Sequence, residues 1–482
     1  MATSDESNGG TIGSVEDTSA GEPESNDGAT AEDATAAEST TGATGEPAAA
    51  TGASTGEPAA ADGSLSGNGP ESHENGRFGR RVRRSRSALG GALGVVGTVL
   101  GAATAAPVSG ASLDRSRTVR QRVLEEREAE AWDAIRSAVD GRVTICGSTQ
   151  ATDGRRCFWL GEVAGVDGRA SARSIPHDEF DVARALAPVD DGGAVVVGNS
   201  SPRRTGATSD VLAVRTEADG RTRSRTVFGE SGYAYCNAVI RTRDGGYLIG
   251  GGAIPDGGSE MDAWIAKTDA ELGRTWSRTY GRSDGDTVNA IAEAPDGGVL
   301  LVGSTAGGHN DVWLVKVDDR GRREWDRTIG GDGYDLARAA IATRDGGYAF
   351  AGHTTSGADG KRAWIATLDA AGELSWERTY RDGERSLAHD LVETDRGFAV
   401  AGESTGADGG ARAFVATVDR VGTWRQKRTF DRAASARSIL TVDDGRYVVV
   451  GTTRAGGPRG SAHPWIASVA PATGRPEPTG AS

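Results

Sequence analysis

The sequence predicts an all-β fold, a seven-bladed β-propeller of four-stranded antiparallel blades that is closed by an N-terminal strand in the last blade. A turn phrase recurs, as TRDGGYLIG at Thr242–Gly250 and TRDGGYAFAG at Thr343–Gly352. Its counterparts follow at intervals of 49 to 53 residues, a period typical of repeat architectures. Each repeat offers four short apolar or β-branched runs separated by turn residues, which is the pattern of a meander. The second turn Gly or its counterpart is, in order, Arg142, Gly193, Gly246, Gly298, Gly347, Gly397 and Arg446.

Each strand of a repeat has its own signal. The first is a small apolar run such as NAIAEA at 289–294, and the second follows the Asp-Gly turn, as in GGVLLVG at 297–303. Asp-Gly between apolar runs favours a tight hairpin, because Gly adopts positive φ without steric cost. The fourth strand ends in an Arg-Thr-apolar triplet. The third carries one large anchor, which we expect to pack between blades rather than to stack on sugars: Trp159, Leu212, Trp264, Trp313, Trp364, Phe414 and Trp465.

The last repeat has no fourth strand of its own. Three prolines, Pro471, Pro476 and Pro478, follow its third strand, and proline cannot serve a central strand. A spare triplet, Arg117-Thr118-Val119, precedes the first repeat. We therefore expect residues 115–121 to supply the missing outer strand, with a helical turn over 124–130. The alternative is a single helix over 119–139, whose apolar residues have roughly helical spacing.

Composition separates the two ends of the chain from the repeats. Residues 1–76 hold 15 acidic residues, no Lys or Arg and almost no large apolar residues, so this acidic tail should be disordered. The whole chain carries a net charge of -14, which belongs to this tail and leaves no basic nucleic-acid footprint. Residues 471–482 form a second disordered tail. The propeller occupies residues 107–470, and we expect it to be a monomer.

Residues 77–106 have the order of an export signal, with paired arginines followed by a Gly/Ala-rich apolar run over 88–106. The arginine pairs resemble a twin-arginine signal, which implies export of the folded protein to the cell surface or the extracellular space. A cleaved signal and an uncleaved membrane anchor both remain open. Arg far outnumbers Lys, which resembles the composition of proteins from high-GC or halophilic sources.

The long, variable loops are the expected binding face. In a propeller, the loops between strands two and three share one face with those between repeats, and binding residues usually lie on such loops. The second group of loops places acidic and aromatic side chains near the mouth of the central channel: Asp178, Asp181, Tyr233, Tyr235, Asp286, Tyr334, Asp335 and Glu384.

These carboxylates have two interpretations. Converging carboxylates could bind calcium through oxygen ligands. Alternatively, each Asp closes its own turn by accepting local amides. We favour the second interpretation, because no loop has EF-hand spacing and the acids do not share one strict column. We therefore expect no cofactor and no metal, with calcium as the weaker alternative.

The sequence offers no catalytic constellation. Its histidines are scattered over different repeats without a repeated pairing to an Asp or a nucleophile. We therefore expect a non-enzymatic binding or interaction scaffold with a protein or glycan ligand on the long-loop face. The alternative is an enzymatic propeller, a quinoprotein-like dehydrogenase or a polysaccharide-acting enzyme, with its site at the channel mouth. Of the three cysteines, Cys146 and Cys157 lie on neighbouring expected strands, where they either form a bridge or remain buried free thiols.

The repeat as a whole resembles a group of secreted or surface archaeal and bacterial proteins with DGGY-type repeats. Their pattern is T-x-D-G-G-Y, three apolar residues, G-x-T, then D-x-W and W-x-x-T-Y-G, and the resemblance spans residues 115–470. It implies a propeller outside the cell and, for most such proteins, no defined activity. The segments VDDRGRREW (317–325) and LDAAGELSW (368–376) more distantly resemble the D-x-x-T-G-x-x-x-W segments of quinoprotein-like propellers.

Overall fold

The computed structural model describes Arg83–Arg84 and residues 119–470, apart from short gaps. The chain divides into two units, Met1–Glu74 and Asn75–Ser482, and every described residue belongs to the second. The expected tails, and the expected export signal apart from Arg83–Arg84, lie outside the described residues. The gaps are 125–127, 152, 167, 179, 203–207, 230–231, 256–257, 283–284, 306–309, 358, 407, 431–433, 443–444 and 455–459.

The described residues form an all-β fold without a helix, in which the strands group in fours along the chain. The first groups are β3 (Ala129–Arg136), β4 (Val143–Gln150), β5 (Arg156–Val163) and β6 (Ala170–Ile175); β7 (Phe180–Pro188), β8 (Ala194–Ser201), β9 (Asp210–Thr216) and β10 (Thr222–Phe228); and β11 (Ala234–Arg241), β12 (Tyr247–Ala253), β13 (Asp262–Thr268) and β14 (Arg274–Tyr280). Next come β15 (Asp286–Glu293), β16 (Val299–Thr305), β17 (Asp311–Val317) and β18 (Arg323–Ile329); and β19 (Asp335–Ala342), β20 (Tyr348–Thr354), β21 (Arg362–Leu368) and β22 (Leu374–Tyr380). The last are β23 (Arg385–Thr394), β24 (Gly397–Thr405), β25 (Ala411–Asp419) and β26 (Trp424–Phe430); and β27 (Ser435–Thr441), β28 (Tyr447–Arg454) and β29 (Ala462–Val469), joined by β2 (Val119–Val123). The two-residue strand β1 (Arg83–Arg84) pairs with the outer strand β18.

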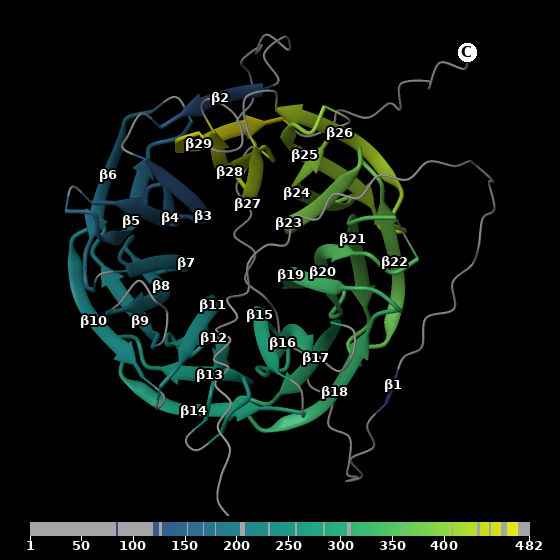
Figure 1. Cartoon of the computed structure of the whole chain (residues 1–482), viewed down its shortest axis with the longest axis horizontal. Helices are drawn as coiled ribbons and strands as arrows, with labels where there is room; N and C mark the ends of the chain where they lie inside the picture. The colour runs from purple at the N-terminus through teal and green to yellow at the C-terminus, as the bar shows by residue number, and fades with distance from the viewer. Residues whose placement is uncertain are drawn as a thin grey trace, which may run out of the picture. The chain divides into compact units, whose positions relative to one another are not determined.

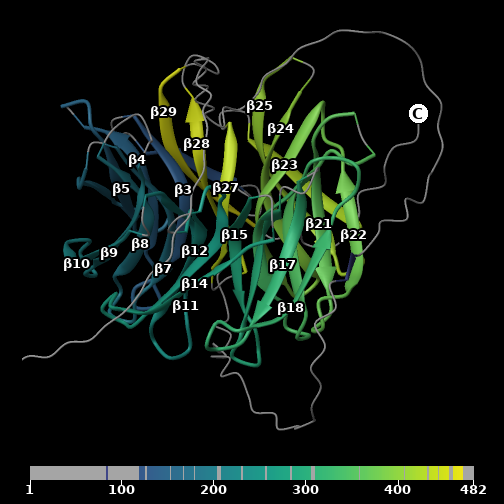
Figure 2. The same cartoon turned by 60° about the horizontal axis from the view of Figure 1, so that its bottom comes forward.

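Within each group the strands pair antiparallel in chain order, as in β11-β12-β13-β14. Figure 1 shows these sheets set radially, with the first strand of each nearest the centre and the fourth outermost. We call the first strand of each sheet its inner strand. The turned view in Figure 2 shows that the strand ends, and therefore the loops, lie at two opposite faces. This arrangement is propeller-like and carries side chains from every sheet toward one axis.

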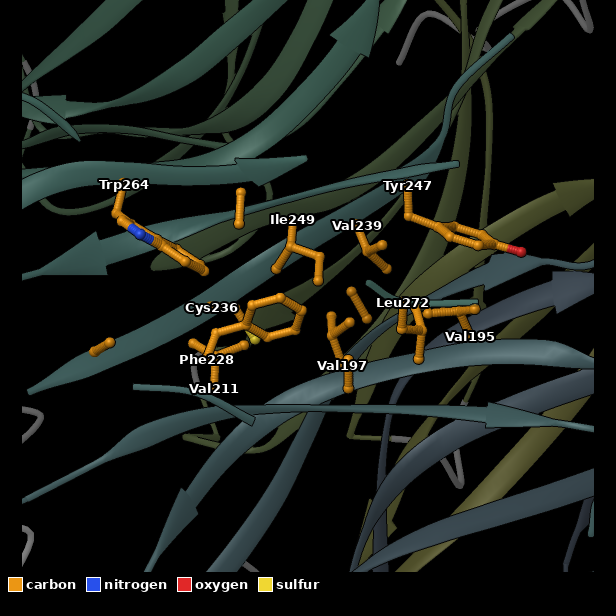
Figure 3. Close-up of a cluster of buried hydrophobic side chains, with 14 of the residues drawn as sticks. Val195, Val197, Val211, Phe228, Cys236, Val239, Tyr247, Ile249, Trp264 and Leu272 are labelled. Atoms are coloured by element: carbon orange, nitrogen blue, oxygen red, sulfur yellow. The ribbon is translucent and has the colours of Figure 1, made fainter. Parts of the chain in front are cut away.

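The hydrophobic core lies between neighbouring sheets. One cluster joins Val195 and Val197 of β8 to Ile249 of β12 and Trp264 of β13, as Figure 3 shows. All seven anchors of the third strands are at most 2% exposed, which confirms that this column is core. Burying one such large side chain contributes on the order of 2–3 kcal/mol. A third-strand anchor therefore fixes each sheet to its neighbour.

The Asp-Gly-Gly turn that follows β7, β11, β15 and β19 is a structural device. The Asp244 carboxylate accepts hydrogen bonds from the backbone N of Gly246 at 3.1 Å and from Nζ of Lys267 at 3.0 Å. Gly245 has a φ of 85°, which favours glycine. A Cβ on Gly246 would lie 2.1 Å from the carbonyl oxygen of Thr268. Gly245 is therefore required by its backbone conformation, and Gly246 by the close approach of a neighbouring strand. In two other sheets the turn Asp also forms an ion pair with the third strand: Asp191 with Arg215, and Asp296 with Lys316.

Each inner strand also carries one β-bulge, and one glycine of the second strand makes room for it. In β15 the register shifts at Asn289, and a Cβ on the facing Gly303 would lie 1.8 Å from the carbonyl oxygen of Thr287. The same close approach recurs in every sheet. The glycine that follows the apolar run of each second strand is therefore required by the bulge opposite it. The bulged residues are Trp132, Arg184, Asn237, Asn289, Arg338, His389 and Arg437. Their glycine partners are Gly147, Gly198, Gly251, Gly303, Gly352, Gly402 and Gly451.

An N-terminal strand completes the last sheet, whose order is β2-β29-β28-β27. Residues 119–123 form β2 and residues 129–136 belong to β3, so the alternative of one helix over 119–139 is wrong. The helical turn expected over 124–130 is also wrong at Ala129 and Glu130, which begin the inner strand β3. Burial at Ala129 and Ala131 has the period of two that one face of a strand requires, and the bulge at Trp132 moves the next buried residue to Ala134.

The register of β2 differs from the expected one. Thr279 of the triplet lies opposite the anchor Trp264, whereas Val123 lies opposite the anchor Trp465. The counterpart of the triplet is therefore Arg122-Val123-Leu124 and not Arg117-Thr118-Val119. Leu124 takes the apolar third position, because it is 3% exposed and its backbone N donates to the Pro464 carbonyl at 2.9 Å. Burial of Leu124 decides the register of β2. The sequence match of Arg117-Thr118-Val119 to the triplet predicted a different register.

All three cysteines are buried free thiols, so Cys146 and Cys157 are not bridged. Desolvation raises the pKa of the Cys146 thiol well above its ordinary value, which keeps it protonated and unreactive. Among the described residues, no helix has the length and apolarity needed to cross a bilayer. The expected anchor segment, 88–106, lies outside the described residues.

Candidate functional site

Several bulged residues of neighbouring inner strands touch one another, and Figure 1 shows these inner strands nearest the centre. The Trp132 ring lies between two guanidinium groups, Arg184 at 4.9 Å and Arg437 at 5.2 Å from its centroid. Arg437 also approaches Nε2 of His389 at 3.4 Å. These four residues come from four successive sheets. The repeat therefore builds a belt of polar and aromatic side chains around the axis.

The amide side of this belt is hydrogen-bonded at Asn237, whereas Nδ2 of Asn289 is buried without a hydrogen-bond partner among the described residues. Nδ2 of Asn237 donates to the Val288 carbonyl at 3.0 Å and faces Oδ1 of Asn289 at 3.3 Å. Both partners belong to the next sheet, β15–β18. These contacts join two neighbouring sheets through their inner strands. The remaining belt residue, Arg338 of β19, behaves differently.

Arg338 belongs to a group of three basic side chains that we call the cationic cluster: Arg338, Lys361 and Arg385. Lys361 directly precedes β21, and Arg385 is the first residue of β23. The cluster borders an aromatic wall, because the Tyr334 ring stacks on His353 at 5.7 Å and 21°, and Lys361 Nζ lies 5.5 Å from the centroid of the same ring. Residues from two neighbouring sheets therefore assemble one cationic and aromatic site.

The charges of this cluster act on one another. Burial, and then the charge of Arg437, lowers the pKa of Arg338. Burial, and then the charges of Arg385 and Arg338, lowers the pKa of Lys361. Burial and the same cations lower the pKa of His353 to about 2, so this histidine is neutral and adds no charge. The backbone is consistent with this grouping, because the N of Ser386, which follows Arg385, donates to the Lys361 carbonyl at 2.9 Å. Like charges within reach of each other lower one another's pKa.

Solvent exposure and desolvation coexist at Arg338. Its side chain is exposed to water, and yet surrounding protein lowers its pKa. Arg338 is therefore accessible to water while the protein around it partly desolvates its guanidinium group. Within the described part of the chain, no carboxylate forms an ion pair with Arg338, Lys361 or Arg385. Arg338 and Arg385 are therefore exposed to water, and no carboxylate among the described residues is ion-paired with the cationic cluster.

Glu403 of β24, whose charge acts on Arg338, Lys361 and Arg385, is hydrogen-bonded and ion-paired elsewhere. Its carboxylate lies 3.2 Å from Nε2 of His389 and 3.8 Å from the guanidinium of Arg437. Burial alone would raise the pKa of Glu403, but the hydrogen bond with His389 and nearby positive charge lower it to about 2. Burial and then Arg437 lower the pKa of His389 to about 3, so His389 is neutral near pH 7 and donates a neutral hydrogen bond. Arg437 thus supplies the charge that balances Glu403.

Three of the acids predicted from the sequence as site residues stabilise local turns instead. Asp181, Asp286 and Asp335 are buried, and each lies three residues before the bulged residue of its inner strand. Each accepts a hydrogen bond from the backbone N of the residue four positions earlier, at 2.9, 2.6 and 2.7 Å respectively. These bonds close the turns that enter the sheets, as the turn-closing interpretation predicts. These three acids share one column of the repeat, whereas Asp178 and Glu384 occupy other positions.

Asp178 and Asp181 come together with His177, and one ligand atom of each lies within 4.8 Å of the others. The atoms are already engaged in local bonds. The Ser200 hydroxyl lies 2.6 Å from Oδ1 of Asp181, 3.1 Å from Oδ2 of Asp178 and 3.0 Å from Nδ1 of His177. Oδ2 of Asp181 accepts the backbone N of Asp178 at 3.0 Å. The group is a hydrogen-bonded corner of the β6–β7 turn.

The other predicted residues lie apart from this corner. Tyr233 and Tyr235 meet edge to face at 6.2 Å, and the Tyr235 hydroxyl donates to Oγ1 of Thr287 in the next sheet at 2.7 Å. Glu384 is exposed, and its backbone N donates to the Thr405 carbonyl at 2.9 Å. Tyr334 alone of the eight belongs to the cationic site.

Sequence reasoning missed the cationic cluster. The sequence does hold a signal for Arg338. It lies fourteen residues before Gly352, just as the bulged residue Asn289 lies fourteen residues before Gly303. Alignment of the repeats on that glycine therefore finds five of the seven bulged residues, because Trp132 lies fifteen residues before Gly147 and His389 thirteen before Gly402. Lys361 and Arg385 occupy other columns, and only the packing of two sheets brings them to Arg338.

No protein-family model matches this chain, and no curated protein matches it. Solved structures resemble it in fold. YCF48 bound to D1 peptide is 12% identical with a TM-score of 0.45, covering 75% of this chain and 98% of that chain. The polysaccharide lyase Uly1 is 11% identical with a TM-score of 0.45, covering 72% and 90%. BBS1N in complex with ARL6DN is 11% identical with a TM-score of 0.44, covering 73% and 95%. Likeness at this level assigns no activity to this chain.

Proposed function

We propose that this chain is an exported, non-enzymatic seven-bladed β-propeller that binds a protein or glycan ligand at the mouth of its central channel. The observation that carries the proposal is the cationic cluster, a set of basic groups beside the Tyr334 ring that forms no ion pair with a carboxylate of the described residues. A binding site in an uncharacterised protein typically combines an apolar or aromatic wall with a few convergent polar groups. A ligand that supplies negative charge would remove the repulsion inside the cluster.

A closed ring of seven blades is the architecture that accounts for the contacts between the first and last sheets. The backbone N of Ala131 on β3 donates to Oγ1 of Thr452 on β28 at 3.1 Å. Leu124, Ile145 and Ile466 belong to one hydrophobic cluster that spans both sheets. Pairing of β2 with β29 gives the last sheet its fourth strand and protects the β29 edge. In this proposal β2 fastens the N-terminal side of the domain to its C-terminal side.

Export is supported by the order of residues 77–106, with paired arginines before an apolar Gly/Ala run. In this proposal the domain works at the cell surface or outside the cell. Its basic ligand site then faces envelope or extracellular components. The segment acts either as a cleaved signal or as an anchor, and both place the propeller outside.

Catalysis at the His177 corner is disfavoured by its geometry. A serine nucleophile needs a histidine that bonds the serine with one ring nitrogen and an orienting acid with the other. Here Nδ1 of His177 faces both Ser200 at 3.0 Å and Asp178 at 3.3 Å. One nitrogen cannot fill both roles, so the arrangement supports a structural corner rather than an acyl-transfer site.

The test compares wild-type full-length protein with the channel variant R338Q/K361Q/R385Q on glycan and peptide arrays. We expect binding that the channel variant loses. A matched control, R243Q/R344Q, removes exposed arginines that pair with Glu293 and Asp395 at the Asp-Gly-Gly turns, and should bind normally. Binding that survives in the channel variant would contradict the site. Turnover of a bound glycan, or reduction of a quinone by the protein, would establish the enzymatic alternative.

A further inference from the structure

We infer that the cationic cluster is a site for a multiply charged oxyanion, a phosphate or sulfate group that is either free or carried by a larger ligand. This inference rests on the proposed function, because it names the chemistry that the same site recognises. It depends on three properties of the cluster: the lack of an ion-paired carboxylate among the described residues, the chemistry of its donors and its access from the long-loop face.

The charge favours an anion with more than one negative charge. Arg338, Lys361 and Arg385 form no ion pair with a carboxylate of the described residues, while Glu403 is engaged by His389 and Arg437. A single carboxylate would offset one of three cations. A phosphate or sulfate dianion offsets two, and a diphosphate offsets more, so affinity should rise with ligand charge.

The donors also suit a tetrahedral oxyanion. Two guanidinium groups present planar forks that bind pairs of oxygens, and an ammonium group supplies a compact third charge. The Tyr334 ring holds Lys361 through a cation–π contact, and its stacking on His353 fixes the ring. Because His353 stays neutral, the site needs no protonation of its own to bind an anion.

Access comes from one face of the domain. Tyr334 precedes the inner strand β19, Arg385 opens the inner strand β23, and Lys361 lies in the loop before β21. Tyr334 is 39% exposed, and Arg385 is also exposed. A group projecting from a larger molecule could therefore reach the cluster without opening the sheets.

The first experiment titrates the full-length protein with phosphate, sulfate and diphosphate at constant ionic strength, by calorimetry and thermal melting, with chloride as the reference salt. We expect saturable stabilisation by the oxyanions, strongest for diphosphate, and none by chloride. R338Q and R385Q should each weaken diphosphate binding about tenfold, and R338K should weaken it less because it keeps the charge but loses the fork. R243Q/R344Q should bind as wild type does.

A second measurement separates the site from a folding defect. Because like charges repel in the empty cluster, R338Q/R385Q should melt at or above the wild-type temperature while it loses diphosphate binding. A variant that melts lower and still binds diphosphate would overturn the assignment. So would the absence of saturable binding by every oxyanion up to about 10 mM, well above a millimolar Kd.

The source of the oxyanion is resolved by comparing carriers. Heparin and a phosphorylated peptide are tested beside their unmodified counterparts. Competition by free diphosphate and tighter binding of one modified carrier would show which molecule bears the group. If the arrays reveal a ligand that needs the cluster but that diphosphate does not displace, the oxyanion assignment fails while the proposed binding function stands.

Discussion

The carboxyl groups of Asp133 and Asp390, from sheets that are not neighbours, share the hydroxyl of Ser438 between them. The hydroxyl oxygen lies 3.1 Å from Oδ1 of Asp133 and 3.2 Å from Oδ2 of Asp390. The backbone N of Leu186 donates a hydrogen bond to Oδ2 of Asp133 at 2.9 Å, and the backbone N of Ile439 donates one to Oδ2 of Asp390 at 2.8 Å. A single hydroxyl proton serves one carboxyl at a time. Four inner strands, β23, β27, β3 and β7, are therefore joined by one hydrogen-bonded chain.

This chain predicts a loss of stability as pH rises toward neutrality. Burial raises the pKa of Asp390 from 3.8 to about 7, with local hydrogen bonds opposing and the charge of Asp133 adding to it. The folded state binds this proton more tightly, so the contribution is complete below about pH 4 and is lost as pH rises to 7. Asp390→Asn should reduce the pH-dependent change in the free energy of unfolding by about 1–2 kcal/mol. The value is kept this small because the side chain is partly exposed and solvent screens its charge. Chemical denaturation at several pH values measures it.

The control for that series is Asp395→Asn, which changes an exposed carboxylate paired with Arg344. Its stability profile should follow that of the wild type. Equal pH profiles for wild type and Asp390→Asn would show that the Asp390 carboxyl does not titrate differently in the folded state.

His353 predicts the opposite pH trend. Its pKa is lowered from 6.5 to about 2, chiefly by burial and then by Arg338 and Lys361. Below pH 6.5 the unfolded chain takes up a proton that the folded chain does not, so stability falls as pH decreases. His353→Phe keeps a ring against Tyr334 and should remove about 1–2 kcal/mol of the loss between pH 6.5 and 5. His463→Phe on β29 is the control, and a wild-type slope in His353→Phe would refute the prediction.

The glycine opposite each bulge predicts a large effect of one methyl group. A Cβ on Gly303 would lie 1.8 Å from a backbone oxygen, which cannot move without distorting the bulge. Gly303→Ala should destabilise the domain by about 2–4 kcal/mol. Gly410→Ala, whose Cβ would lie no closer than 3.3 Å to a side-chain atom of Asp408, should change stability by no more than about 0.5 kcal/mol. Urea unfolding compares the two, and similar values would contradict the role of the bulge.

The register of β2 predicts which of two neighbouring side chains matters. Leu124 is 3% exposed and Val123 is 39% exposed. Leu124→Ala should cost about 2–4 kcal/mol, and Val123→Ala should cost less than about 1 kcal/mol. Thermal melting decides between the registers, because alignment on Arg117-Thr118-Val119 would not single out Leu124.

The sequence by itself determined the local order of the fold. The period, the Asp-Gly-Gly turns and the anchor column from Trp159 to Trp465 depend on neighbouring residues along one strand or hairpin, so pattern alone could predict them. It also indicated that an N-terminal strand belongs to the last sheet. The turn-closing interpretation foresaw the roles of Asp181 and Asp335, because an Asp bonds amides close to it in sequence.

Tertiary structure decided what the repeats bring together. The register of β2 follows from burial of Leu124 against β29, a contact between opposite ends of the domain. The cationic cluster joins Arg338 and Lys361 of one sheet to Arg385 of the next, from three different positions of the repeat. A repeat pattern compares like positions, whereas an electrostatic site sums charges over space whatever their positions. For that physical reason the sequence predicted acidic loops, and the packed sheets produced a basic site.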